Sequence, residues 1–462
     1  MYKRKEAGKG GSYYPAFLCM EVNTPEDLYY LCRYPLDERT EAVFLHEYIH
    51  YLQDLTTVSG LARIETIIDQ IKWVHGVAMS HNKIKVPMDL NTWAYNIKPN
   101  AHSLSISKGD FKVHDDKGHE IAADIISIVS FELIDTTIFY SSGNKYHGKA
   151  VAQLIFNDQH DIERKYNVGE MAISESMAYL IENHVYPNVL QKPSACPYFV
   201  VKKIAEWKMR RTIDDITLIA ICDVCLLYAL PGKALYDILE KLQYCKTPIN
   251  PAAVYMYGLG AEMADKFSRK KFWTDELATT IDTAKKQFSD LFVHPYWNDF
   301  RMITNQVFDS ALTLRIQNPR FFLEIAKGGC LPINKQINDC INKLGCLAIK
   351  TSTDAVYNFL PLETNALNLD SDWFLSLHQL YNILFTNVAI GRDNAGKRIL
   401  GMECKLKQWC RDSFRRKNEL DITSSSPNCS WSPWLNVSHK DLEQCSFGRI
   451  WAAFGFGRIK LK

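Results

Sequence analysis

The sequence has no long apolar stretch and no excess of charge of either sign. Its longest apolar run, residues 216–230, is 15 residues long and contains Asp223, whereas a helix needs about 20 apolar residues to cross a membrane. The 54 Lys and Arg residues nearly balance the 52 Asp and Glu residues, which leaves a net charge of +2. We therefore expect no membrane span and no general electrostatic attraction to nucleic acid.

The beginning of the sequence has no apolar segment that could form the core of a secretory signal peptide. Lys3, Arg4 and Lys5 lead instead into a glycine-containing stretch followed by two tyrosines. The 13 cysteines are odd in number, and most of them lie in apolar stretches. These features predict a cytoplasmic protein whose cysteines are reduced and behave as small apolar side chains.

Several motifs that carry chemistry in other proteins are missing or incomplete. We find no glycine-rich phosphate-binding loop and no nucleophile elbow. Cys222 and Cys225 have CxxC spacing, but no second pair accompanies them, so we expect them to pack in the core. The irregular spacing of the later cysteines does not favour a structural zinc site: Cys404, Cys410, Cys429 and Cys445. A basic stretch predicts a solvated helix face rather than a nucleic-acid surface: Lys405, Lys407, Arg411, Arg415, Arg416 and Lys417.

Periodicity predicts an α+β protein that is predominantly helical. Asp37 can cap a helix that runs to about Val58, with Gly60 as its stop, and a second amphipathic helix follows at residues 61–79. A β-ribbon, a further strand and a helix are then expected at residues 104–113, 149–156 and 168–184. Later helices are expected at residues 212–230, 234–243, 274–292, 297–316, 372–390 and 404–417, with a short strand at residues 346–350.

The length of the sequence limits the number of domains that it can form. A chain of 462 residues predicts two or three domains or one large core with insertions. A soft boundary lies near residues 187–197, where prolines cluster. We expect residues 1–195 to form an α+β part with a small antiparallel sheet. Residues 196–462 would form a large helical part that shapes a cleft or binds partners, although the two parts could share one core.

The motif most informative about chemistry is the pentapeptide from His46 to His50, which has the pattern HExxH. On a helix, the two histidines lie about 40° apart and one turn apart, so both imidazoles can reach one metal ion. Glu47 flanks that ion rather than binding it, and can take a proton from an attacking water molecule.

The surroundings of this motif strengthen the interpretation. His46, Glu47, His50, Gln53 and Asp54 fall within an arc of about 120° on a helix, while most other residues from 42 to 55 are apolar. A surface helix normally has a polar half, whereas this helix has one narrow polar stripe. Burying such a stripe without partners is costly. We therefore expect the stripe to face a metal, a cleft or other polar groups, with Gln53 and Asp54 suited to orient a ligand imidazole.

A catalytic zinc ion usually has three protein ligands and one open position. A third histidine at HExxHxxGxxH spacing is excluded, because Thr56 occupies that position. A glutamate on a later helix is the other common choice, and Glu175 lies mid-helix in an apolar setting. The alternatives that remain open are Glu182, His147 and His184.

The chain here resembles the gluzincin-type HExxH zinc metallopeptidases, which thermolysin-like enzymes represent. The resemblance covers residues 46–54 and, more weakly, residues 169–182. It implies a zincin-like N-terminal part in which His46, His50 and Glu175 bind one catalytic zinc ion and Glu47 is the general base. The sequence departs from the family pattern in the 124 residues between His50 and Glu175, and in Ser174, where the family has Asn.

Such enzymes also need a donor that stabilises the oxyanion, and a place for the substrate. The sequence offers several possible donors without distinguishing among them: Tyr140, Tyr146, His147, Tyr166 and His184. A peptide can bind by adding a strand to a sheet edge, and residues 104–113 or 149–156 are the expected edges.

These observations predict a cytoplasmic zinc metallopeptidase that acts on protein or peptide substrates. The large amount of sequence outside the motif suggests selectivity for a few proteins. Two other classes of protein remain possible from the sequence. One is a non-catalytic interaction protein whose metal is structural or absent, and the other is a zinc hydrolase of a non-peptide amide.

Overall fold

The computed structural model describes most of the first 364 residues. The described ranges are 10–364, except 16–17, 32, 82, 85–105, 116, 140–144, 188, 190–192, 246–247, 260–262, 265–269, 272 and 354–355, together with 452–455 and 460–461. The helices predicted at 372–390 and 404–417, the four later cysteines and the basic stretch from Lys405 to Lys417 lie outside these residues.

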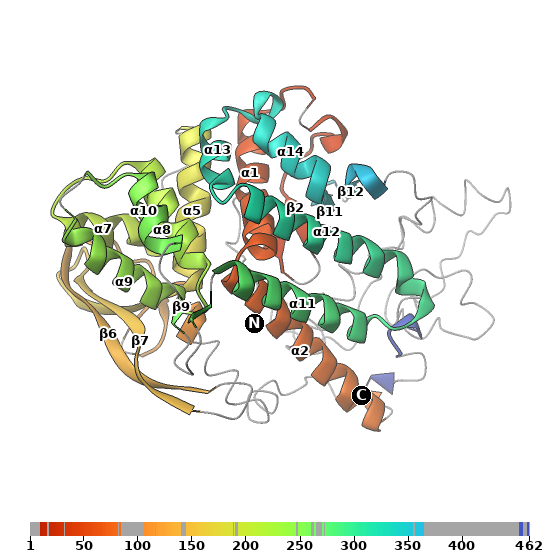
Figure 1. Cartoon of the computed structure of the whole chain (residues 1–462), viewed down its shortest axis with the longest axis horizontal. Coiled ribbons are helices and arrows are strands. Elements are labelled where there is room, and N and C mark those ends of the chain that lie inside the picture. The colour runs from red at the N-terminus through yellow and green to blue at the C-terminus, as the bar shows by residue number, and fades with distance from the viewer. Residues whose placement is uncertain are drawn as a thin grey trace, which may run out of the picture.

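Helices make up most of the described structure, which confirms a predominantly helical α+β protein (Figure 1). The helices are α1 (Glu38–Thr56), α2 (Val58–His81), α5 (Glu170–Val185), α6 (Ala195–Tyr198), α7 (Val200–Met209), α8 (Asp215–Leu226), α9 (Pro231–Gln243), α10 (Pro251–Leu259), α11 (Trp273–Leu291), α12 (Asn298–Gln317), α13 (Phe321–Lys327) and α14 (Lys335–Leu344). Within the described ranges, no helix is long and apolar enough to cross a membrane.

The strands form two main sheets and three short pairs. A four-stranded sheet has the order β1 (Gly11–Tyr14), β2 (Cys19–Val22), β11 (Cys346–Thr351) and β12 (Val356–Phe359). A three-stranded antiparallel sheet has the order β6 (Ser127–Phe139), β7 (Lys145–Asn157) and β8 (Glu163–Val168). The short pairs are β3 (Lys83–Ile84) with β13 (Lys460–Leu461), β4 (Val113–His114) with β5 (Glu120–Ile121), and β9 (Met263–Ala264) with β10 (Lys270–Lys271).

The first two helices are confirmed, but the role predicted for Gly60 is wrong. Asp37 caps α1 by accepting a hydrogen bond from the Thr40 backbone N–H. Helix α1 ends at Thr56, and Gly60 lies in the first turn of α2 rather than at the end of α1. A Cβ atom at Gly60 would lie 2.4 Å from the Gln53 carbonyl oxygen. Glycine is needed there because the backbones of α1 and α2 approach closely at their junction.

The predicted β-rich part is confirmed only in places. The strand at 149–156 is the middle of β7, and a hairpin turn joins β4 to β5, with Gly118 at a φ of +79°. Residues 106–108 are helical rather than extended, and among the described residues of the ribbon predicted at 104–113 only Val113 lies in a strand, β4. Strand β7 pairs with β6 on one side and β8 on the other. Residues 152–157 pair on both sides and have no free edge, whereas residues 149–151 pair with β6 alone among the described strands. The substrate-binding edge predicted at 149–156 is therefore wrong for residues 152–156 and stays a prediction for residues 149–151.

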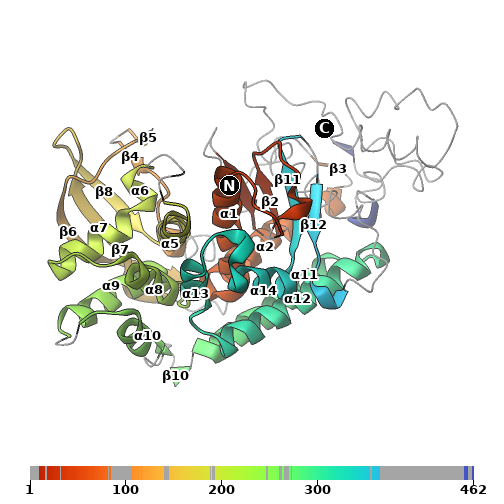
Figure 2. The same ribbon diagram turned by 90° about the horizontal axis from the view of Figure 1, so that it is seen from above.

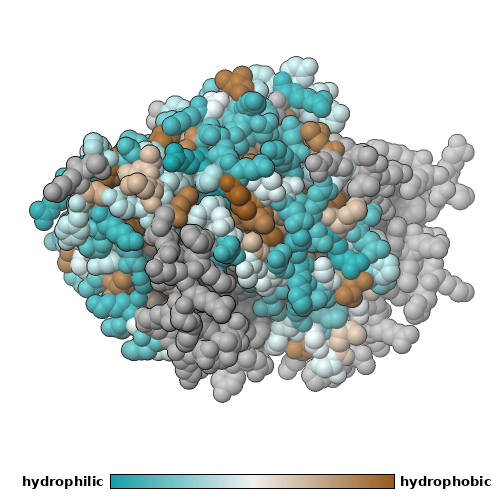
Figure 3. All heavy atoms as spheres, viewed as in Figure 1, coloured by the Kyte–Doolittle hydropathy of each residue, from teal (hydrophilic) through white to brown (hydrophobic). Residues whose placement is uncertain are grey.

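One hydrophobic cluster contains side chains from both sides of residue 195. It includes Phe44 of α1, Leu218 of α8 and Phe308 of α12. Strand β11 also pairs in parallel with β2, which joins strands from the two predicted parts in one sheet. The two predicted parts thus share a core, and the separate roles assigned to them stay a prediction. Hydrophilic residues predominate on the described part of the face in Figure 3.

The core of the helical part contains a buried ion pair. Asp223, the one acid in the longest apolar run, accepts hydrogen bonds from Arg315 of α12 at 2.7 and 3.2 Å. Neighbouring Cys222 and Cys225 are fully buried, and burial raises the pKa of both thiols. This confirms that the CxxC pair packs in the core.

Candidate metal centre

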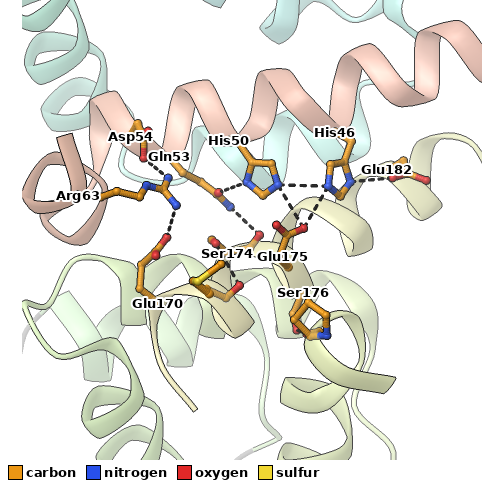
Figure 4. A network of polar contacts seen from close by, with 12 residues as sticks. His46, His50, Gln53, Asp54, Arg63, Glu170, Ser174, Glu175, Ser176 and Glu182 are labelled. Carbon is orange, nitrogen blue, oxygen red and sulfur yellow. Dashed lines mark hydrogen bonds and ion pairs between the residues drawn. The ribbon is translucent and has the colours of Figure 1, made fainter. Parts of the chain in front are cut away.

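Helices α1 and α5 pack against each other and bring the predicted ligands together. His46 and His50 project from α1 toward Glu175 of α5 (Figure 4). The side chains of His50 and Glu175 are 1% and 3% exposed, whereas His46 is 14% exposed. The group is therefore accessible mainly from the side of His46.

The three side chains place one atom each at the corners of a nearly equilateral triangle. His46 Nε2 and His50 Nε2 are 3.2 Å apart, and Glu175 Oε2 lies 3.3 Å from the first and 3.4 Å from the second. Zinc bonds of about 2.0–2.1 Å at tetrahedral angles separate neighbouring ligand atoms by about 3.3–3.4 Å. The observed spacing therefore fits three corners of a zinc tetrahedron, and these residues form the one group of at least three potential ligands found in the described structure.

Two further side chains fix which nitrogen of each imidazole faces this triangle. His46 Nδ1 donates to Glu182 Oε2 at 2.8 Å, and His50 Nδ1 donates to Gln53 Oε1 at 2.8 Å. Gln53 Nε2 in turn donates to the Ser174 carbonyl at 3.1 Å, which determines how its amide is oriented. We assign both protons to Nδ1 from this network.

This assignment has an electrostatic consequence. With Nδ1 protonated, the Nε2 lone pairs of His46 and His50 point toward each other and toward the Glu175 carboxylate. Three electron-rich atoms at this distance repel one another unless a metal ion or a shared proton lies between them. The donor set of two neutral imidazoles and one carboxylate is also one that zinc accepts. The residues present therefore fit the metal that the sequence predicts.

The pKa of His46 also indicates that the surroundings of this imidazole favour positive charge. Burial lowers this pKa, but the hydrogen bonds and negative charges of Glu175 and Glu182 outweigh burial and raise the pKa well above its ordinary value. The surrounding carboxylates therefore stabilise a cation at this position.

Glu47 lies on the side of α1 that faces strand β1. Its side chain is buried, and a Cβ atom at Gly11 would lie 2.8 Å from Glu47 Oε1. Only a residue without a side chain allows β1 to pass this closely. Strand β1 is also one edge of its sheet among the described strands, so Glu47 lies between the metal-ligand helix and a sheet edge.

A second polar network holds the two ligand helices together. Arg63 of α2 forms ion pairs with Asp54 near the end of α1 and with Glu170 at the start of α5 (Figure 4). All three side chains are at most 5% exposed. We expected both Gln53 and Asp54 to orient a ligand imidazole, but Asp54 pairs with Arg63, and of these two residues only Gln53 contacts one of the histidines. Glu170 pairs with Arg63 and does not belong to the group of potential ligands.

The alternatives for the third ligand lie elsewhere. Glu182 binds the outer nitrogen of His46 instead of joining the triangle. His147 contacts Thr137 on the β6–β7 ribbon, and His184 is exposed. Of the three alternatives, none contributes to the group of potential ligands.

The structure also narrows the choice of oxyanion donor. The Tyr166 hydroxyl donates to the Asp110 carbonyl at 2.6 Å and is buried there, and Tyr140 and the side chain of Tyr146 lie outside the description. Tyr198, which we did not predict, has its ring centroid 6.4 Å from that of His46. Tyr198 ends the short helix α6, and no motif marks it in the sequence.

Gln53 provides a direct test of how the imidazoles are oriented. We expect Gln53→Leu to weaken zinc binding by about 10–100-fold, because His50 loses the acceptor that fixes its ring. Competition with a chromogenic chelator measures this affinity. Gln243→Leu, an exposed change on α9, is the matched control. An affinity equal to that of the native protein would contradict the assigned role of Gln53.

Comparisons of the chain with models of known families, with curated proteins and with solved structures give no match. The resemblance to HExxH metallopeptidases therefore rests on the residues of this site alone.

Proposed function

We propose that this protein is a zinc-dependent metallopeptidase with a zincin-like active-site helix. The observation that carries the proposal is the triangle of His46 Nε2, His50 Nε2 and Glu175 Oε2, with sides of 3.2–3.4 Å. The hydrogen bonds that hold both outer nitrogens support it. Three protein ligands leave one position of a tetrahedral zinc open, as catalytic sites require.

Zinc at this position would supply Lewis acidity, which activates water and polarises a carbonyl. The protein's own residues supply the proton transfers and the positioning. Glu47 takes a proton from the attacking water and returns it to the leaving amine. Tyr198, next to His46, can donate a hydrogen bond to the oxygen that becomes negatively charged in the transition state.

Limited access to the ligands supports selectivity for a few protein substrates. Only His46 is appreciably exposed among the three ligands, so an extended segment reaches the site more easily than a folded surface does. The same burial also favours the second candidate function, in which the metal is structural and the protein binds partners without catalysis.

The two functions are separated by analysing the metal and the activity of the same full-length protein. We expect near-stoichiometric zinc and cleavage within a peptide library, both of which are lost in His46→Ala. His184→Ala, an exposed change on α5, is the matched control and should retain both. Stoichiometric zinc without cleavage of any peptide would favour the structural role, while hydrolysis of non-peptide amides alone would favour the other class of zinc hydrolase.

A further inference from the structure

The three-stranded sheet has a long edge that no other described strand covers. Strand β6 (Ser127–Phe139) has 13 residues and pairs with β7 alone among the described strands. The edge strands of the other main sheet, β1 and β12, have four residues each. Figure 2 shows β6 on the outer side of its sheet, far from β11 and β12. An edge strand presents unpaired N–H and C=O groups that can pair with another strand.

The opposite edge of this sheet is already occupied. Strand β8 lies beside Asp110, whose backbone N–H donates to the Asn167 carbonyl at 2.8 Å. The Asn167 N–H donates to the Asp110 carboxylate at 2.8 Å, and the Tyr166 hydroxyl donates to the Asp110 carbonyl. On the outer side of β6, the described residues form no such backbone hydrogen bonds. Of the two edges in the described sheet, β6 is therefore the one open to a further strand.

Strand β6 is supported on one face of the sheet by helices α7 and α9. Both helices contact it, and Phe131 is buried with its ring 5.7 Å from that of Tyr236 of α9. From Ser130 to Phe139, every residue of β6 has a partner in β7. The edge is thus formed before a partner arrives, so binding carries little cost for ordering this strand.

The charge of β6 indicates what kind of strand it would accept. Its 13 residues include two acidic side chains, Glu132 and Asp135, and no basic one. Both carboxylates are exposed, and neither takes part in an ion pair in the described structure, although Lys149 of β7 lies opposite Asp135 in the ladder. Many edge strands carry lysine or proline, which discourage pairing with another chain, and β6 has neither.

We propose that the outer edge of β6, from Ser130 to Thr137, binds an extended basic segment of a partner protein, which adds a fourth strand to the sheet. Glu132 and Asp135 are three positions apart, so they project to opposite faces of the sheet. A partner strand whose two basic residues are also three positions apart would place one of them near each acid. A second copy of β6 fits less well, because it would bring two more acidic side chains to the same edge. The proposal does not depend on the metal or on catalysis.

The probe for this edge is the fluorescein-labelled peptide TVKVTKVT, which has two lysines three positions apart among β-branched residues. We expect it to bind the full-length protein, as measured by fluorescence anisotropy. Glu132→Lys combined with Asp135→Lys should weaken binding by at least about tenfold, because attraction becomes repulsion between like charges. Glu163→Lys combined with Asp282→Lys is the matched control. It changes the net charge equally at exposed positions on β8 and α11, and should bind the peptide as the native protein does.

A second measurement on the native protein separates strand addition from attraction between charges. In a strand, the N–H groups of alternate residues point to the same edge. N-methylation of either the odd or the even residues of the peptide therefore removes the donors that face β6. We expect one of these two methylated peptides to lose binding and the other to keep it. Amide hydrogen exchange should also show added protection within residues 130–137 in the complex.

Three results would overturn the proposal. The first is that the unmodified peptide does not bind, or that it binds the charge-reversed variant of β6 as tightly as the native protein. The second is that both methylated peptides bind equally, which would show that the contact is electrostatic only. The third is that the native protein sediments as a dimer whose β6 amides are already protected from exchange, which would show that a second copy occupies this edge.

Discussion

Replacing Glu47 with glutamine is expected to lower kcat/KM for peptide hydrolysis by about 10²–10⁴-fold, the usual contribution of a general base. Glutamine has nearly the same size but cannot accept the proton of the attacking water. Glu47 does not belong to the group of potential metal ligands, so the zinc content should stay the same. Steady-state kinetics on a cleaved library peptide, together with elemental analysis of the purified protein, measures both quantities.

The appropriate control is another glutamate on the same helix. Glu38 lies in the first turn of α1 and is exposed, so Glu38→Gln should leave activity and zinc unchanged. Cleavage by Glu47→Gln at the native rate would contradict the proposed mechanism. Loss of both activity and zinc would instead show that Glu47 helps to hold the metal.

Replacing Arg63 with methionine is expected to lower the free energy of unfolding by about 3–5 kcal/mol, because it leaves buried charges without their counter-ion. Arg63 pairs with Asp54 and Glu170, whose side chains are 0% and 5% exposed. The loss should also disturb zinc binding, since the ion pairs connect the ends of the two ligand helices. Urea-induced unfolding followed by circular dichroism measures the change.

Two further variants check this explanation. Lys285 and Asp309 form an ion pair with side chains 25% and 61% exposed, so Lys285→Met should cost less than about 1 kcal/mol. Adding Asp54→Asn and Glu170→Gln to Arg63→Met should restore part of the stability, because the buried charges are gone. A loss in Arg63→Met no larger than that in Lys285→Met would contradict the role assigned to the buried network.

Local patterns were sufficient to predict the helix that carries the histidines. The apolar periodicity and the Asp37 cap located α1, and the HExxH spacing placed two imidazoles one turn apart. The choice between Glu175 and Glu182 was harder, because both lie on nearly the same face of α5. Which one reaches the imidazole Nε2 atoms depends on how α1 and α5 pack, and a sequence pattern within one helix does not contain that information.

The missed features depend on contacts between distant residues. Strands β1 and β2 have four residues each, too few for a clear alternation, and β2 gains its second neighbour from β11. Tyr198 lies in a four-residue helix and approaches His46 only through tertiary packing. Asp54 fitted the polar stripe of α1, but its partner Arg63 belongs to the next helix.

The parallel pairing of β2 with β11 also determines when the protein can finish folding. During synthesis both histidines and Glu175 leave the ribosome long before β11 (Cys346–Thr351), the strand that pairs with β2 in the sheet beside α1. A lone two-stranded hairpin such as β1–β2 is at best marginally stable in water. The helices that carry the proposed zinc ligands would therefore emerge with one flank unsupported, and a nascent chain interrupted before residue 346 would carry all three of these residues without β11 and β12.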